Sequence, residues 1–191
     1  MESHLVLSAG ARRSIEPEMR VDPAGVERLA DVVYDPADAD APIGSGSFPA
    51  VGMVVVPCSM RTLATVAGRD PDNLVSRAAC ATLGGGRRLV LVTRETPLSY
   101  IHLRNMAAVT EAGAIVLPPI PPFRPELPLI PELLAQLCAT VLDQFALASP
   151  GRAHPAEPPG QRVNSRCSRP NWSRILPTVC RSRSSLVSGW W

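Results

Sequence analysis

The sequence contains no lysine, few aromatic residues and no long apolar run. All 19 basic residues are arginines, a bias from which we draw no functional conclusion, and aromatic residues make up 4% of the 191 residues. No apolar stretch approaches the roughly 20 residues of a membrane-spanning helix, and the first residues lack the basic head and apolar stretch of a secretory signal. Apolar residues still make up 46% of the chain, enough for a buried core. We therefore expect a cytoplasmic protein with no membrane partner.

The cysteines show no paired spacing of the kind that metal sites use. They are Cys58, Cys80, Cys138, Cys167 and Cys180. With no export signal, we expect reduced thiols and no metal site.

Charge divides the chain into two parts. Residues 1–148 hold 12 arginines and 16 acidic residues, a net charge of −4, whereas residues 149–191 hold seven arginines and one acidic residue, a net charge of +6. The acidic balance of the first part argues against a nucleic-acid partner. We predict a domain over 1–148 and a disordered tail rich in arginine, serine and proline over 149–191. A shifted reading frame and a basic partner-binding tail both remain open as explanations of the tail.

Alternating strand and helix patterns indicate an α/β fold with a parallel sheet. The patterns predict four strands, at 4–7, 52–56, 87–92 and 114–117, and helices at about 23–32, 59–67, 73–83, 99–111 and 131–145. The charged stretch 8–22 predicts no element, and Pro57 is expected to end the second strand. Four strands are few for a doubly wound domain.

Two strand-to-helix junctions carry the residues that suggest a ligand site. The apolar strand 52–56 leads into a turn with Ser59 and Thr62, whose hydroxyls add donors to the free N–H groups of a helix start. The strand 87–92 leads into Arg94 and Glu95. Because open α/β sheets bind ligands at the carboxyl ends of their strands, we expect the two junctions to converge on one nucleotide.

The motifs in this order resemble the flavin prenyltransferase (UbiX) family of flavin-containing Rossmann-like proteins. They are GSGSF (44–48), GMVVVPCSMRTLA (52–64), DNLVSRAA (72–79), RRLVLVTRETPLSYIHLRNM (87–106) and GAIVLPPIPPF (113–123). The resemblance implies a three-layer Rossmann-like (flavodoxin-like) fold with helices on both faces of a parallel sheet. It also implies transfer of a dimethylallyl group from dimethylallyl phosphate to reduced FMN. The product, prenylated FMN, would serve a UbiD-type decarboxylase, and relatives commonly form dodecamers.

The resemblance assigns a role to each of several residues. Ser8 and the turn Ser59, Met60, Arg61 and Thr62 would bind the flavin, Arg94 would contact flavin and prenyl phosphate, and Glu95 would move a proton. The resemblance also implies a catalytic role for Ser45 in the loop at the flavin edge, a substrate-binding role for Arg77, and a further polar group near the site at Glu18.

Three departures from the family pattern bear on activity. The family opens with a strand and a glycine-rich flavin-binding turn, and nothing of that kind precedes Met1. The family's phosphate-facing lysine falls on Gly84, and a basic residue of the last helix falls on Thr140. The family's tyrosine falls on Arg124, which would restore some positive charge to the prenyl-phosphate site. We therefore expect a family member without the usual first strand, with weak or no turnover.

Two other functions and two other residues stay under consideration. The alternatives are a flavin-dependent decarboxylase of the same superfamily, which the turn Pro57-Cys58-Ser59 disfavours, and a non-catalytic FMN-binding remnant. Cys58 is a candidate nucleophile, but packing in the core is the simpler role for a cysteine after an apolar strand. For His102 a structural role on the helix 99–111 is favoured over catalysis.

Overall fold

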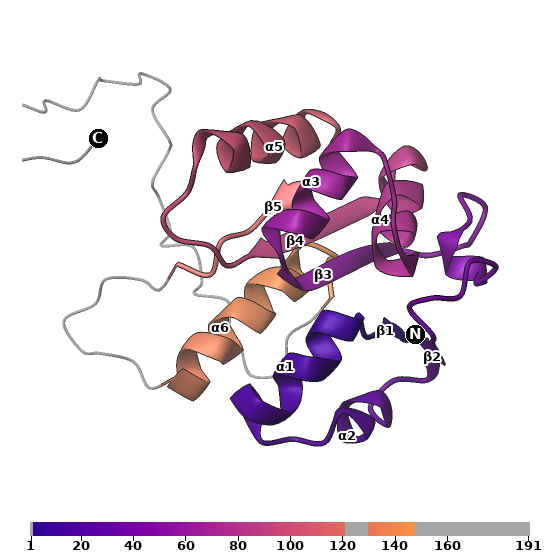
Figure 1. Ribbon diagram of the computed structural model, residues 1–191, viewed down its shortest axis with the longest axis vertical. Coiled ribbons are helices and arrows are strands. Elements are labelled where there is room, and N and C mark those ends of the chain that lie inside the picture. Colours follow the sequence, from indigo (N-terminus) through magenta and orange to yellow (C-terminus); the bar gives the residue numbers. More distant parts are fainter. Residues whose placement is uncertain (1, 121–129, 148–191) are drawn as a thin grey trace, which may run out of the picture. The chain divides into compact units, whose positions relative to one another are not determined.

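The structure is a computed structural model that describes residues 2–120 and 130–147. Arg124 and the whole tail 149–191 lie outside these residues, so the predictions for them stay predictions. Figure 1 shows the order of the elements. They are β1 (His4–Val6), α1 (Ala9–Met19), α2 (Pro23–Glu27), β2 (Val32–Tyr34), β3 (Gly52–Cys58), α3 (Met60–Gly68), α4 (Leu74–Gly84), β4 (Arg88–Thr93), α5 (Tyr100–Glu111), β5 (Ile115–Val116) and α6 (Ile130–Asp143), with a 3₁₀ turn at Pro42–Gly44.

The strands form two parallel sheets. One sheet pairs β1 with β2, and the other has the order β3-β4-β5. Helices α3, α4 and α5 lie on one side of the second sheet, and α6 lies on the other (Figure 1). The α/β class and the parallel pairing are confirmed. No ladder joins β1 to β3 within the described residues.

Two predictions for the first 35 residues were wrong. The stretch 8–22, for which no element was expected, contains α1, because Ser8 caps a helix whose charged residues conceal its periodicity. The helix expected over 23–32 ends at Glu27, and 32–34 forms β2. Pairing with β1 decides the second case, since Val33 lies opposite Leu5. The described residues thus contain five strands rather than four.

The expectation that Pro57 ends the second strand was also wrong. β3 continues to Cys58, and its register with β4 shifts between Val55 and Cys58. Proline has no N–H to donate to a ladder, so it is tolerated in a strand at such an irregularity.

Side-chain caps explain why three helices begin where they do. Ser59 accepts a hydrogen bond from the Thr62 N–H at 3.1 Å, Asn73 from the Ser76 N–H at 3.1 Å, and Ser99 from the His102 N–H at 3.3 Å. Such a cap satisfies a backbone donor that the first turn leaves without a partner, and it contributes about 1 kcal/mol. The predicted start of α3 at Ser59 is confirmed, with Ser59 as the capping residue.

The core lies between the second sheet and helices α3 to α5. Leu89 and Leu91 of β4 are fully buried there, together with Leu63 of α3 and Val109 of α5. Val90, on the opposite face of β4, is also fully buried. Burial on both faces is characteristic of a central strand in a parallel sheet, so β4 is the best-covered strand in the described residues.

Gly52 allows β3 to approach its neighbours closely. A Cβ atom at Gly52 would lie 2.4 Å from the Arg88 carbonyl oxygen and 2.6 Å from Phe145 Cε1. We predict that Gly52→Ala lowers the free energy of unfolding by about 1–3 kcal/mol, measured by urea denaturation. Gly46→Ala is the control, because nothing lies within 4 Å of a Cβ there. Equal stability of the two variants would contradict the prediction.

Candidate functional site

The two predicted ligand-binding junctions leave the second sheet side by side. Cys58, the last residue of β3, pairs with Thr93, the last residue of β4. Ser59 and Arg94 follow these residues directly, and adjacent strands are about 4.8 Å apart. We call this side of the sheet, where the strands end, the carboxyl edge. The expectation that both junctions lie at one edge is confirmed.

At the first junction, hydroxyl groups surround the start of α3. Ser59 Oγ lies 3.0 Å from Thr62 Oγ1 and accepts from the Thr62 N–H. The N–H groups of Met60 and Arg61 have no intrahelical acceptor, because they belong to the first turn. Hydroxyls, free amides and the positive end of the helix dipole together suit an anionic or carbonyl oxygen.

Arg61 makes an ion pair that sequence reasoning missed. Its guanidinium lies 2.8 Å from Asp72 Oδ2, while 85% of its side chain stays exposed. The hydrogen bond from Arg61 is the main reason that the pKa of Asp72 lies below its usual value. Arg61 therefore ties the start of α3 to the turn before α4, and Asp72 competes with any ligand for its charge. In the sequence, only the predicted turn at 70–73, which contains Asp72, pointed to this ion pair.

Arg94 contacts a residue from a distant part of the chain. Its guanidinium lies 3.6 Å from Glu18 Oε2 near the end of α1, and both side chains are more than half exposed. Glu95 follows Arg94 and makes no hydrogen bond or ion pair within the described residues. Arg94 thus has Glu18 near it in space and Glu95 next to it in sequence, at the junction that adjoins the start of α3. We call Glu18, Ser59, Thr62, Arg94 and Glu95 the carboxyl-edge cluster.

Ser8 occupies the equivalent position on the first sheet. It follows β1, and its Oγ accepts from the Ala11 N–H at 3.1 Å as the cap of α1. Both serines that the resemblance assigned to the flavin therefore cap helices at the carboxyl ends of parallel strands.

Arg77 and Ser45 belong to a separate group. The Arg77 guanidinium donates to the Ala39 carbonyl oxygen, and its side chain packs beside Gly44. Ser45 is exposed and lies 2.9 Å from Ser47 Oγ. Neither residue contacts the carboxyl-edge cluster, so these two assignments gain no support from the geometry.

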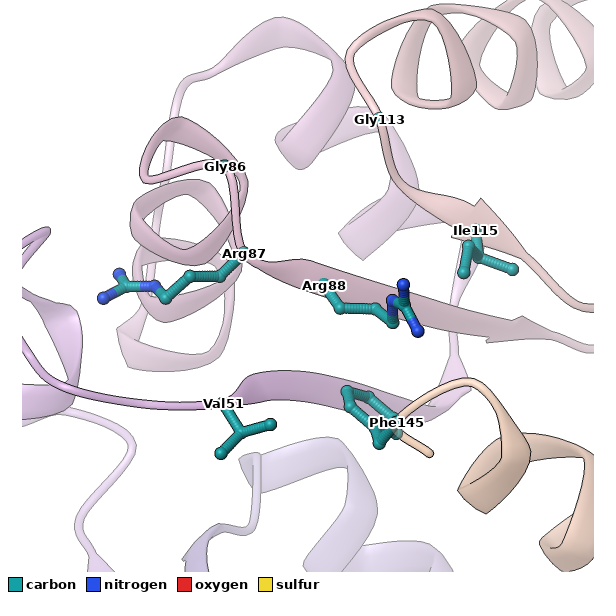
Figure 2. Close-up of a pocket in the computed structure, with 7 residues that line it drawn as sticks. All are labelled: Val51, Gly86, Arg87, Arg88, Gly113, Ile115 and Phe145. Atoms are coloured by element: carbon teal, nitrogen blue, oxygen red, sulfur yellow. The ribbon is translucent and has the colours of Figure 1, made fainter. Parts of the chain in front are cut away.

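The opposite edge of the second sheet, where its strands begin, holds a hollow of about 530 Å³ (Figure 2). Arg87 and Arg88 line it, but Arg87 donates to the Phe48 and Ala81 carbonyl oxygens and Arg88 to that of Gln144. These arginines hold backbone segments together and leave few donors for a ligand. Gly84 ends α4 at this side of the sheet, away from the carboxyl-edge cluster.

Cys58 and His102 have structural surroundings. Cys58 is 1% exposed within the core, and its burial raises the pKa of its thiol to about 12. At neutral pH the thiol therefore stays protonated, which favours the packing role. The His102 ring accepts from the Ser99 N–H at 3.3 Å and completes the cap of α5, so its role in this structure is structural.

The donors at the carboxyl edge fit a flavin mononucleotide. Two helix starts, the hydroxyls of Ser59 and Thr62, and the guanidinium of Arg94 offer hydrogen-bond donors to a phosphate and to ring carbonyl oxygens. Among the residues described, no three histidine, cysteine or carboxylate side chains gather as metal ligands do. The same residues contain no helix long and apolar enough to cross a membrane.

Comparison with known proteins gives one consistent result. The family model described as Flavoprotein matches residues 4–139. A protein of Streptomyces sp. (strain D7), described as a probable UbiX-like flavin prenyltransferase, is 47% identical over 150 residues, which are 78% of this chain and 75% of the relative.

Two solved structures are also closely similar. AnUbiX (PadA1), crystallised with FMN and dimethylallyl pyrophosphate, is 49% identical with a TM-score of 0.76, over 78% of this chain and 79% of that one. A dodecameric FMN-dependent UbiX-like decarboxylase from Escherichia coli O157:H7 is 45% identical with a TM-score of 0.76, over 80% of this chain and 84% of that one.

Because Cys58 is buried, we predict that its thiol reacts slowly with alkylating reagents. In the native protein we expect iodoacetamide at pH 8 to label Cys58 at least about tenfold more slowly than the exposed Cys138, because the buried thiolate is disfavoured. Labelling in urea is the control, and there the two sites should react alike. Rapid native labelling of Cys58, followed by peptide mass spectrometry, would contradict the packing role.

Proposed function

The chain belongs to the Flavoprotein family and, within it, to the UbiX-like flavin prenyltransferases, and we propose that it joins a dimethylallyl group to FMN. The prenyl donor is dimethylallyl phosphate, and the carboxyl-edge cluster is the site. The relative crystallised with FMN carries a dimethylallyl pyrophosphate, so the number of phosphates that this chain accepts is part of the proposal.

The observation that carries the proposal is the pairing of Cys58 with Thr93. It sets the hydroxyl-bearing start of α3 beside Arg94, so that one ligand can contact both. A helix start alone would suit any anion. A helix start beside a permanently charged guanidinium and a carboxylate without a partner suits a reaction in which an anion leaves and a proton moves.

The residues have distinct tasks in this proposal. Arg94 binds the prenyl phosphate and stabilises the negative charge that grows as the allylic carbon–oxygen bond breaks. Glu95 accepts the proton released as the new ring closes, and Glu18 orients Arg94 through their ion pair. Ser8, Ser59 and Thr62 hold the flavin, which when bound supplies the nitrogen and carbon atoms that receive the prenyl group.

We propose slow turnover for residues 1–191 alone. Thr140, where the resemblance places a basic residue, offers no charge to the phosphate, and its hydroxyl donates to the Gln136 carbonyl oxygen within its own helix. The product would pass to a UbiD-type decarboxylase.

The test of prenyl transfer is incubation of the protein with reduced FMN and dimethylallyl phosphate, followed by mass spectrometry of the flavin. No prenylated flavin after prolonged incubation with bound FMN would refute the proposal.

A decarboxylase is the second candidate, because the E. coli O157:H7 relative is described as one. No cysteine or histidine side chain belongs to the carboxyl-edge cluster, and Cys58 is buried. The same assay distinguishes the two, since a decarboxylase would release carbon dioxide from an added acid and leave the mass of the flavin unchanged.

We also propose that the chain assembles with copies of itself through α5. Leu98, Tyr100, Ile101 and Leu103 are each at least 42% exposed, with Tyr100 at 78%. A helix that is apolar on its outer as well as its inner face is normally buried. The 45% identical dodecamer makes a second copy the favoured partner. This surface begins three residues after Glu95, so assembly would also shield the proposed site.

Replacement of Arg94 tests the phosphate contact. We predict that Arg94→Ala weakens the binding of dimethylallyl phosphate to the FMN-loaded protein by roughly 10- to 100-fold, because a charged hydrogen bond is lost. Isothermal titration calorimetry measures this change. Arg13→Ala is the matched control, since Arg13 is an exposed arginine of α1 outside the carboxyl-edge cluster, with no ion pair in the described residues. Equal affinities for the two variants would refute the role of Arg94.

A charge on α5 tests the assembly surface. We predict that Ile101→Glu reduces the native mass to that of smaller assemblies or the monomer, because a carboxylate would be buried against a second copy. Light scattering after size-exclusion chromatography measures the mass. Leu29→Glu is the control, because Leu29 is 84% exposed and lies outside α5. An unchanged mass for Ile101→Glu would contradict the proposed surface.

A further inference from the structure

We propose that Asp72 sets how tightly the protein holds the phosphate of a flavin mononucleotide, by competing with that phosphate for the guanidinium of Arg61. This role rests on the proposed function, because it takes the flavin to be a substrate that binds at the start of α3. It adds a residue that acts on binding and release of the flavin through Arg61.

Arg61 places a permanent positive charge at a helix end that is already positive. It is the second residue of α3, between Met60 and Thr62, and the helix begins after its capping residue Ser59. The helix dipole disfavours a cation in the first turn. An anion close to Arg61 offsets this penalty, and both the Asp72 carboxylate and a ligand phosphate are anions of that kind.

The start of α4 holds the Asp72 carboxylate in place. Asp72 Oδ1 accepts from Asn73 Nδ2 at 2.7 Å and from Ser76 Oγ at 3.1 Å, and Ser76 is fully buried. The Asp72 N–H donates back to Ser76 Oγ at 3.1 Å. These contacts leave Oδ2 to face Arg61 Nη2 at 2.8 Å. The carboxylate therefore keeps its position whether or not Arg61 is paired with it.

The Arg61 side chain, in contrast, has few restraints. It is 85% exposed, and within the described residues its guanidinium makes a single hydrogen bond, to Asp72. An ion pair this exposed contributes little stability. A phosphate can accept from two N–H groups of one guanidinium. A fixed carboxylate thus holds a cation that can turn to a phosphate when one is bound.

A competing carboxylate suits a flavin that has to leave the protein. In the proposed reaction FMN is the prenyl acceptor, so the product departs with its phosphate still attached. A guanidinium without a counter-ion would bind the phosphates of substrate and product equally tightly, and slow product release can limit turnover. Asp72 lowers this shared affinity, because Arg61 regains a partner as the product leaves.

A purely structural role for the ion pair makes a different prediction. A pair that only joined α3 to the turn before α4 would affect every ligand of the site alike when it was broken. Competition for a cation affects only a ligand that carries an anion. FMN and riboflavin separate the two cases, because riboflavin has the same ring and ribityl chain without the phosphate.

The test measures binding of FMN and of riboflavin to the full chain by fluorescence titration, and FMN dissociation by stopped flow. Asp72→Asn removes the charge and keeps an oxygen for Asn73 and Ser76. Asp70→Asn is the matched control, since Asp70 is exposed in the same loop and its side chain makes no hydrogen bond or ion pair in the described residues. Arg61→Ala and the double variant with Asp72→Asn complete a cycle.

We expect Asp72→Asn to tighten FMN binding about three- to fivefold at low salt and to slow FMN dissociation, with riboflavin affinity unchanged. The gain should largely disappear at about 0.5 M sodium chloride, because salt screens exposed charges. It should also be absent when Arg61 is already replaced by alanine.

Weaker or unchanged FMN binding by Asp72→Asn would overturn the inference. So would an equal change for riboflavin, an equal gain from Asp70→Asn, or a gain that persists without Arg61. Binding is measured without dimethylallyl phosphate, so failure of prenyl transfer would leave this result standing. Absence of prenylated flavin together with the expected changes in binding would refute the reaction alone.

Discussion

Parallel pairing of β3 with β4 is the constraint on which the rest of the described structure depends. Their shared hydrogen bonds place Leu89 and Leu91 against α3 and α5, and these contacts form the core. The same pairing ends both strands at one edge. The core and the proposed site are therefore consequences of a single register, and a slip of one residue would expose the leucines and separate Ser59 from Arg94.

Three arginines near the two ends of β4, Arg87, Arg88 and Arg94, differ in role according to the edge of the second sheet at which they lie. At the edge where the strands begin, Arg87 and Arg88 bond backbone carbonyl oxygens and hold loops in place. At the carboxyl edge, the one ion pair of Arg94 within 2–120 and 130–147 is with Glu18, at 3.6 Å and largely exposed to water. An exposed pair of this kind contributes little stability, so Arg94 remains available to a ligand anion. For Arg87, Arg88 and Arg94, the position along the sheet thus separates a structural role from the proposed binding role.

The division of the described strands into two sheets and the proposed site are related by topology. Ser8 and Ser59 cap helices on two sheets that no ladder joins in the described residues. Binding of one flavin by both caps depends on the distance between them, which packing between the two sheets sets.

Local patterns were sufficient to predict most of the second half of the fold. The valine run of β3, the leucine–valine run of β4 and the caps at Ser59 and Asn73 act over a few residues, so the strands, the helices and the positions of both junctions could be predicted from the residues alone. The flavin-related assignments of Ser8, Ser59 and Arg94 came from motif resemblance, and their binding roles remain predictions. The start of the chain was predicted less well, because β2 exists only through its pairing with β1, and α1 has a weakly apolar pattern.

Tertiary structure alone decided which candidates meet. The pairing of Arg94 with Glu18, 76 positions apart in sequence, and the capture of Arg61 by Asp72 depend on how separate elements pack. The separation of Arg77 from the cluster depends on the same packing. By itself the sequence determined the α/β class, the two junctions and their chemistry, because hydrophobic periodicity and helix capping are local. The meeting of distant side chains and the division of the described strands into two sheets were decided only in three dimensions, because strand order and long-range contacts leave no local pattern.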